Sequence, residues 1–204
     1  MNLSYCMKQI IEKSLENAIS YSEYRTLVHD LLAVGESTGP NQSDALANYS
    51  MLNDKRMKRL DKTIKISDET KAVFNNITEK QTWLILTEGW CGDAAQSLPV
   101  INKLANENEN IALKIVLRDE HLEVMDLFLT NGGRSIPKVI VLDEENNVTH
   151  TWGPRPTLAT KMAQDYKDKN GSIDAQFKQD LQVWYNKNKG QSIQEDFVKI
   201  ISAF

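Results

Sequence analysis

Apolar residues in the first third of the chain recur at helical spacing, and this pattern predicts three helices. Ser20–Glu23 forms a capping box between the first two helices, and Gly35 ends the second. The third helix is expected over about 43–60. The inward positions of the three helices are Ile10, Ile11, Leu15, Ala18 and Ile19; Tyr24, Leu27, Val28, Leu31 and Leu32; and Leu46, Tyr49, Leu52 and Met57. We therefore interpret residues 1–61 as a helical N-terminal extension that packs on the rest of the chain.

After residue 62 the pattern changes to short apolar runs that alternate with helical segments. The expected strands cover residues 63–66, 83–86, 111–117, 138–142 and 148–152, and the expected helices begin near residues 68, 93, 121, 157, 173 and 192. Alternation followed by a hairpin is typical of a mixed sheet with helices on both faces. The sequence thus predicts an α/β fold with a central mixed sheet of four or five strands over residues 62–204, the C-terminal helices included.

The composition argues against several classes of protein. The chain carries 24 Lys and Arg against 28 Asp and Glu, a net charge of -4, which provides no overall attraction to nucleic acids or anionic membranes. The basic stretch Lys55–Arg59 is interpreted as a solvated helix face. Neither a run of about 20 apolar residues nor a secretory signal pattern is present. Two cysteines, Cys6 and Cys91, exclude a disulfide-rich scaffold, so we expect a reducing, cytoplasmic setting.

The segment Thr87–Ala95 is the strongest candidate for chemistry, because it follows a buried strand and opens a helix. A cysteine at a helix N-terminus is stabilised as the thiolate by the helix dipole and by free backbone N–H groups. Gly92 permits close approach of a partner backbone, and Trp90 provides an apolar wall beside the sulfur. This position favours an exposed, reactive Cys91 over a buried structural one.

A second segment, Gly133–Lys138, lies directly before a predicted strand and places Pro137 at the strand's first position. Taken with Trp90-Cys91-Gly92, it resembles the thioredoxin family, in which a cis-proline segment follows the active-site cysteine. The resemblance covers about residues 62–168. With its N-terminal helices, the whole chain resembles a bacterial thioredoxin-like family that carries a Trp-Cys-Gly-Asp motif.

This resemblance implies a role for each matching residue. Cys91 is the nucleophile, Pro137 is the cis-proline that faces the sulfur, and the backbone of Ile136 pairs with an extended substrate. Arg155 either points into the same groove or is an ordinary loop arginine. The substrate-binding residues that we predict are Trp90, Gly92, Asp93, Arg134, Ile136, Pro137, Gly153 and Arg155.

Three positions depart from the family pattern. Ala94 replaces the second active-site cysteine, Asp93 replaces the proline before it, and Ile85 replaces the buried acid that serves as a proton shuttle. Asp93 opposes a thiolate at Cys91 by its charge but stabilises the helix N-terminus, so the sequence leaves the direction of the thiol pKa open.

Two functions remain compatible with these residues. In the first, Cys91 performs monothiol thiol–disulfide exchange on a disulfide- or thiol-containing protein or small molecule, and an external thiol such as glutathione resolves the mixed disulfide. In the second, the fold is a redox-inactive module that binds a peptide or protein. Cys6 is either a resolving thiol or a semi-buried helix cysteine. We expect no metal and no cofactor besides such a thiol, because the histidines at 29, 121 and 150 lack ligand spacing.

Overall fold

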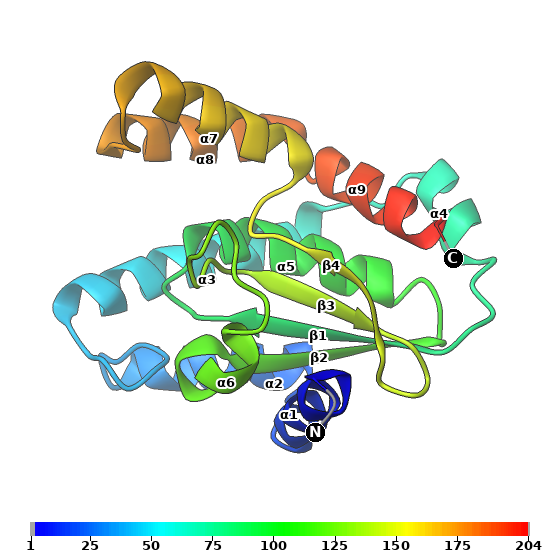
Figure 1. Cartoon of the computed structure of the whole chain (residues 1–204). Coiled ribbons are helices and arrows are strands. Elements are labelled where there is room, and N and C mark those ends of the chain that lie inside the picture. Colours follow the sequence, from blue (N-terminus) through cyan, green and yellow to red (C-terminus); the bar gives the residue numbers. More distant parts are fainter. Residues whose placement is uncertain (1–2, 204) are drawn as a thin grey trace.

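The computed structural model describes residues 3–203 and confirms a mixed sheet flanked by helices (Figure 1). The strands are β1 (Gln81–Thr87), β2 (Ile111–Leu117), β3 (Lys138–Leu142) and β4 (Val148–Trp152). They lie in the order β2-β1-β3-β4; β1 is parallel to β2 and antiparallel to β3, and β4 is antiparallel to β3. The central strand β1 is buried along almost its whole length, as its apolar run predicts.

The helices cover both faces of this sheet (Figure 1). Helices α1, α2 and α6 lie on one face, and α3, α5, α4 and α9 lie on the other. The helical segments are α1 (Leu3–Glu16), α2 (Tyr21–Ala33), α3 (Asp44–Thr63), α4 (Asp68–Phe74), α5 (Gly92–Ala105), η1 (Arg118–Glu120), α6 (Leu122–Met125), α7 (Thr157–Asn170), α8 (Ala175–Asn188) and α9 (Gln191–Ile201). Within residues 3–203, none of them combines the length and apolar character needed to span a bilayer.

The N-terminal helices share one hydrophobic core with the sheet, since Ile11, Tyr24 and Met57 belong to the same buried cluster as the β1 side chains. The predicted capping box is confirmed: the Ser20 hydroxyl accepts the Glu23 N–H, and the Glu23 carboxylate accepts the Ser20 N–H. The backbones of Ile19 and Ile115 pair and tie the start of α2 to strand β2.

The predicted strand at 63–66 is wrong. Helix α3 continues to Thr63, and the following backbone bonds to side chains instead of to a neighbouring strand. The Lys103 ammonium donates to the Ile64 carbonyl at 2.7 Å, and the Gln194 amide donates to the Lys65 carbonyl at 3.1 Å. Ile64 and Ile66 are still buried, which explains why their alternation imitates a strand.

The predicted inward face of α3 is also partly wrong. Tyr49 and Leu52 are 58% and 44% exposed, whereas Ser50 and Asn53 are buried together with Met57. The buried polar groups bind other parts of the chain: the Asn53 amide donates to the Gly89 carbonyl at 3.0 Å. Polar residues thus occupy this face because it meets the loop after β1, whose backbone needs partners.

Helices α7 and α8 form an antiparallel pair that stands apart from the sheet (Figure 1). The pair has its own small core of Ala159, Phe177, Leu181 and Tyr185, separate from the main cluster. This separate core makes α7 and α8 a distinct structural unit next to the candidate site.

Candidate functional site

Cys91 caps the N-terminus of α5, at the end of the loop that follows β1. Its sulfur accepts the Ala94 N–H at 3.4 Å, and its thiol donates to the Ile136 carbonyl at 3.3 Å. The structure therefore brings together the two segments that the sequence singled out. Ala94 occupies the first turn of α5 beside the sulfur, where the family pattern has a second thiol.

The segment opposite Cys91 combines a proline and a glycine with special backbone geometry. The Ile136–Pro137 peptide bond is cis, as is the bond between Gly153 and Pro154. Gly153 has a φ of +115°, and a Cβ atom at this position would clash with the Pro137 carbonyl oxygen. Only glycine fits between the loop after β4 and the proline segment. Gly153 thus permits the close packing that holds Ile136 next to the sulfur.

Trp90 and the two arginines near it form one side of the site. The Arg118 guanidinium lies 4.8 Å from the centroid of the Trp90 ring and donates to the Arg134 carbonyl at 3.2 Å. The Arg134 side chain itself pairs with Asp126 at 2.6 Å. The guanidinium that lines this side of the site is therefore that of Arg118. Arg134, which the sequence predicts as a substrate-binding residue, contributes its backbone carbonyl.

Asp93 lies at the centre of a small polar cluster. Its carboxylate pairs with Arg155 at 2.8 Å and accepts the Tyr185 hydroxyl at 3.1 Å. Burial raises the pKa of Asp93, while Arg155 and Tyr185 oppose this rise because both stabilise the anion. Of the two alternatives for Arg155, the structure favours a side chain at the site. Tyr185 belongs to a late helix that nothing in the sequence links to Cys91.

Cys91 is 9% exposed, so the predicted exposed thiol is wrong. Burial raises the pKa of Cys91 to about 12, and the negative charge of Asp93 acts in the same direction. The backbone N–H groups of Ala94 and Asp93 and the charge of Arg155 oppose this rise without cancelling it. This raised pKa favours the thiol form of Cys91, which can donate to the Ile136 carbonyl.

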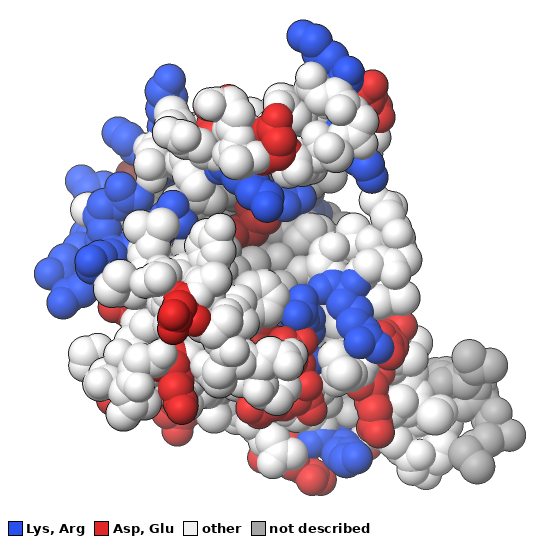
Figure 2. All heavy atoms as spheres, turned by 90° about the vertical axis from the view of Figure 1, so that its left-hand side faces the viewer, with Lys and Arg blue, Asp and Glu red and all other residues white. Residues whose placement is uncertain are grey.

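Helix α8 contributes to this burial. The Gln96 amide of α5 donates to the Gln182 side chain at 2.9 Å, and the Gln182 amide nitrogen lies 3.4 Å from where a Cβ of Gly92 would stand. Figure 2 shows a hollow beneath the α7–α8 pair, bordered on several sides by basic side chains, with acidic ones also visible in it. Helix α8 thus lies against the helix terminus that carries Cys91.

A buried polar network supports the loop behind Cys91. The Thr38 hydroxyl donates to the Glu88 carboxylate and accepts the Gly89 N–H at 2.8 Å, and the Asp119 N–H donates to Glu88 at 2.9 Å. Burial raises the pKa of Glu88, although these hydrogen bonds oppose the rise. Sequence reasoning left Glu88 and Thr38 without roles, because their pairing crosses 50 positions of the chain.

Cys6 does not share this site. It is exposed on α1, contrary to the semi-buried environment expected for it, and α1 lies on the sheet face opposite to α5 (Figure 1). Among residues 3–203, no group of three His, Cys, Asp or Glu side chains is arranged to hold a metal ion.

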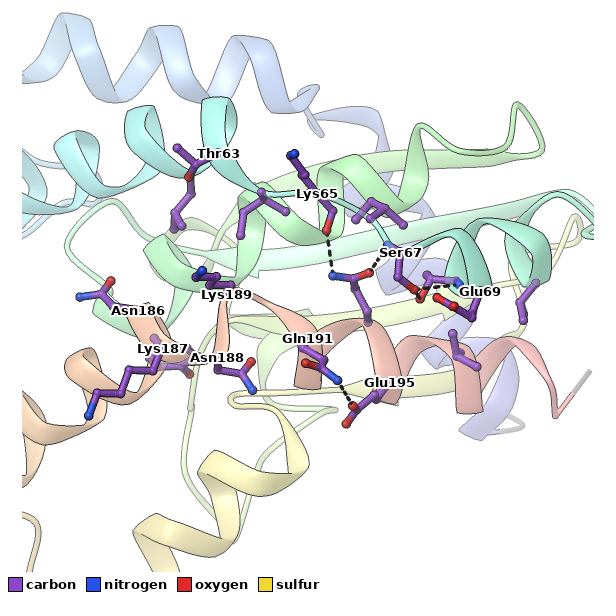
Figure 3. Close-up of a pocket in the computed structure, with 18 of the residues that line it drawn as sticks. Thr63, Lys65, Ser67, Glu69, Asn186, Lys187, Asn188, Lys189, Gln191 and Glu195 are labelled. Carbon is purple, nitrogen blue, oxygen red and sulfur yellow. Dashed lines mark hydrogen bonds between the residues drawn. The ribbon is translucent and has the colours of Figure 1, made fainter.

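A second hollow, of about 1180 Å³, lies between the α3–α4 connection and helices α8 and α9 (Figure 3). Lysines at 65, 187, 189 and 199 share its lining with Glu69 and Glu195. Gln194 closes its floor by bonding to Ser67 and Lys65. Its charges are of both signs, and its lining contains no cysteine or histidine.

Comparisons with known proteins agree with this fold. A family model described as thioredoxin matches residues 39–167. Two solved structures are similar over 91% of this chain: a protein of unknown function from Pseudomonas aeruginosa (98% of its own chain, 18% identity, TM-score 0.59) and an HIV epitope scaffold (99% of its own chain, 19% identity, TM-score 0.57). At this identity they support the fold alone. A search of curated proteins found no match.

Proposed function

Because the chain belongs to the thioredoxin family, whose model matches residues 39–167, we propose that it performs monothiol thiol–disulfide exchange through Cys91. The observation that carries this proposal is the position of the sulfur. It caps α5, accepts a backbone N–H there, and faces the carbonyl that precedes the cis proline. A helix N-terminus stabilises a thiolate once the site opens to water. Ala94 makes the chemistry monothiol, since Cys6 belongs to α1, which lies on the other face of the sheet.

The proposed reaction has two exchange steps. The Cys91 thiolate attacks one sulfur of a substrate disulfide; a bond forms between Cys91 and that sulfur, and the other half leaves as a thiolate that takes up a proton. An external thiolate then attacks the substrate sulfur of this mixed disulfide, forms a new disulfide and releases Cys91 as a thiolate. The net reaction transfers a disulfide from one thiol partner to another and leaves the protein unchanged.

Mass spectrometry of a trapped adduct tests this proposal. In a Cys6→Ser background, incubation with hydroxyethyl disulfide is expected to add one mercaptoethanol unit to Cys91, and millimolar external thiol is expected to remove it. The Cys91→Ser variant is the control and should gain no mass. A protein that stays unmodified after prolonged incubation in native buffer, yet reacts when unfolded, would show that the folded site lacks this activity.

The α8 contact leads to a prediction about access to the sulfur. Gln182→Ala removes the bond to Gln96, and we expect iodoacetamide to alkylate Cys91 about fivefold faster, since one net hydrogen bond contributes about 1 kcal/mol to keeping α8 in place. Gln176→Ala is the matched control, because Gln176 is an exposed glutamine of the same helix whose side chain bonds to Asp180 of that helix. Equal rates in the two variants would mean that α8 does not limit access.

A second candidate function is favoured by the burial of Cys91. A thiol with a pKa near 12 reacts slowly, so a redox-inactive module that binds a peptide through Trp90, Ile136 and Pro137 also fits. In that case Cys91→Ser retains binding, and the adduct experiment gives no product in the native protein. The trapped adduct therefore separates the two candidates.

A further inference from the structure

Arg56 lies beside the N-terminus of α5, although it belongs to the basic stretch that the sequence suggested was a solvated face. It is half-buried, and its guanidinium lies 3.8 Å from where a Cβ of Gly92 would stand. Lys58, two positions further along α3, is exposed. Arg56 is thus the member of the stretch that reaches the loop of Cys91.

Asn53 holds Arg56 in this position. Its side chain is almost fully buried and has two partners: its amide nitrogen donates to the Gly89 carbonyl at 3.0 Å, and its oxygen accepts from Arg56 at 2.9 Å. One side chain therefore connects the loop of Cys91 to the guanidinium. Because Asn53 bonds both to this loop and to Arg56, it fixes the position of the Arg56 charge relative to the Cys91 sulfur.

Arg56 differs from the other arginines of the site in its partners. Arg118 pairs with Asp119 at 2.8 Å, Arg155 pairs with Asp93 at 2.8 Å, and Arg134 pairs with Asp126 at 2.6 Å. Among the described residues, no carboxylate forms an ion pair with Arg56, and its hydrogen bond goes to a neutral amide.

The charged group that acts on Arg56 most strongly is Arg59, another cation. Burial and the charge of Arg59 both lower the pKa of Arg56. A bound anion stabilises a partly desolvated cation that has a second cation beside it more than it stabilises a fully solvated cation.

We propose that the disulfide substrate of Cys91 carries a carboxylate close to its reactive sulfur, and that Arg56 binds this carboxylate. The inference rests on the thiol exchange proposed above. The substrate backbone would lie along Ile136 on one side of the sulfur, and its carboxylate would reach α3 on the other. Basic side chains border the hollow there, as Figure 2 shows. Arg56 would act as a binding residue that determines specificity, because a planar guanidinium binds a carboxylate through two parallel hydrogen bonds.

Three small disulfides that differ mainly in charge provide the test: dithiodipropionate (anionic), hydroxyethyl disulfide (neutral) and cystamine (cationic). The second-order rate of adduct formation at Cys91 is measured for each in a Cys6→Ser background and divided by the rate of the same probe with free cysteine, because the leaving thiols differ in pKa. We expect the anionic probe to react about fivefold faster than the neutral one at low salt, and this advantage to shrink as salt is added. Equal rates for the three probes would overturn the proposal.

Substitutions assign the effect to Arg56. Arg56→Gln is expected to lower the ratio of the anionic to the neutral probe's rate to about one, and Arg56→Lys is expected to restore most of this ratio. Lys58→Gln makes the same change in net charge at an exposed position of α3 and should retain the advantage. If Arg56→Gln and Lys58→Gln lose the advantage of the anionic probe equally, the overall electrostatic field of the protein, rather than this site, attracts the anion. Thermal melts of the variants verify that each one is folded.

The source of the carboxylate is distinguished by two further substrates, glutathione disulfide and the disulfide of a cysteine peptide flanked by Asp and Glu. The faster of the two identifies either a small thiol or an acidic protein segment as the source.

If no disulfide of any charge reacts, thiol exchange fails, and binding is measured instead by NMR titration of the Cys91→Ser protein with dithiodipropionate. Shifts of the Gly89 and Gly92 amides that vanish on Arg56→Gln would support the anion site on its own. No shifts would overturn it.

Discussion

Asp93→Asn is expected to lower the pKa of the Cys91 thiol by about two units, because the substitution removes the negative charge next to the sulfur and leaves Arg155 without its carboxylate partner. Asparagine has nearly the same shape as aspartate and still accepts hydrogen bonds from Arg155 and Tyr185. The sign follows from the charges: an anion destabilises the thiolate and a cation stabilises it, so both changes favour ionisation. Burial is unchanged and keeps the pKa above that of a free cysteine.

The measurement is the pH dependence of iodoacetamide alkylation in a Cys6→Ser background. A pKa lower by about two units raises the thiolate fraction at pH 8 about a hundredfold. The less basic thiolate is also a weaker nucleophile, so the net gain in rate at pH 8 is about tenfold. The midpoint of the pH profile is therefore the more sensitive readout.

Asp54→Asn is the matched control for this experiment. Asp54 is another poorly exposed carboxylate of α3, and it pairs at 2.7 Å with Arg25 of the neighbouring helix α2. Its substitution should leave the midpoint for Cys91 in place. An unchanged midpoint in Asp93→Asn as well would show that burial alone controls the thiol, and that Asp93 acts only by holding Arg155 and Tyr185.

The sequence predicted most of the fold because its signals are local. The apolar run at 83–86 and the capping box at Ser20 each follow from residues within a few positions of one another. The predictions are wrong where contacts with distant parts of the chain determine the local structure. The segment 63–66 has the spacing of a strand, yet Lys103 and Gln194 bind its backbone from elsewhere in the chain. The buried face of α3 differs from the predicted one for the same reason, since Asn53 is buried where it binds the Gly89 carbonyl.

The candidate site divides in the same way. Motifs identify Cys91 and Pro137, and the resemblance to the thioredoxin family adds Gly153. The environment of the sulfur was not found, because it depends on α8: Gln182 and Tyr185 approach α5 from about 90 positions away. An argument from the helix dipole alone favours an exposed thiolate. The added helix pair reverses that result, since desolvation raises the pKa more than the free N–H groups lower it.

Ala94→Cys is expected to convert the single thiol into a pair that resolves its own mixed disulfide. Ala94 is buried in the first turn of α5, three residues after Cys91, and its N–H lies 3.4 Å from the sulfur. Residues three apart in a helix share one face, so a thiol at 94 meets the Cys91 sulfur. It would attack the Cys91 sulfur of the mixed disulfide, form a bond between residues 91 and 94, and release the substrate thiol. Reaction within one chain proceeds at a high effective concentration, so the adduct should decay at least about a hundredfold faster than with 1 mM external thiol.

The readout is the lifetime of the Cys91 adduct with hydroxyethyl disulfide, followed by mass spectrometry in a Cys6→Ser background, together with the appearance of a species two mass units lighter than the reduced variant. Ala95→Cys is the matched control: Ala95 is equally buried in the same turn, but its side chain points about 100° away around the helix, so its thiol should leave the adduct lifetime unchanged. Both variants add one sulfur atom to a packed core, and similar thermal melts would show that they are comparable.

If the adduct persists equally in both, position 94 does not face the reactive sulfur during exchange, and the alanine there is not the reason for monothiol behaviour. If the 91–94 disulfide forms in Ala94→Cys alone, the site has kept the geometry of a dithiol enzyme, and the single substitution at 94 accounts for the missing second step.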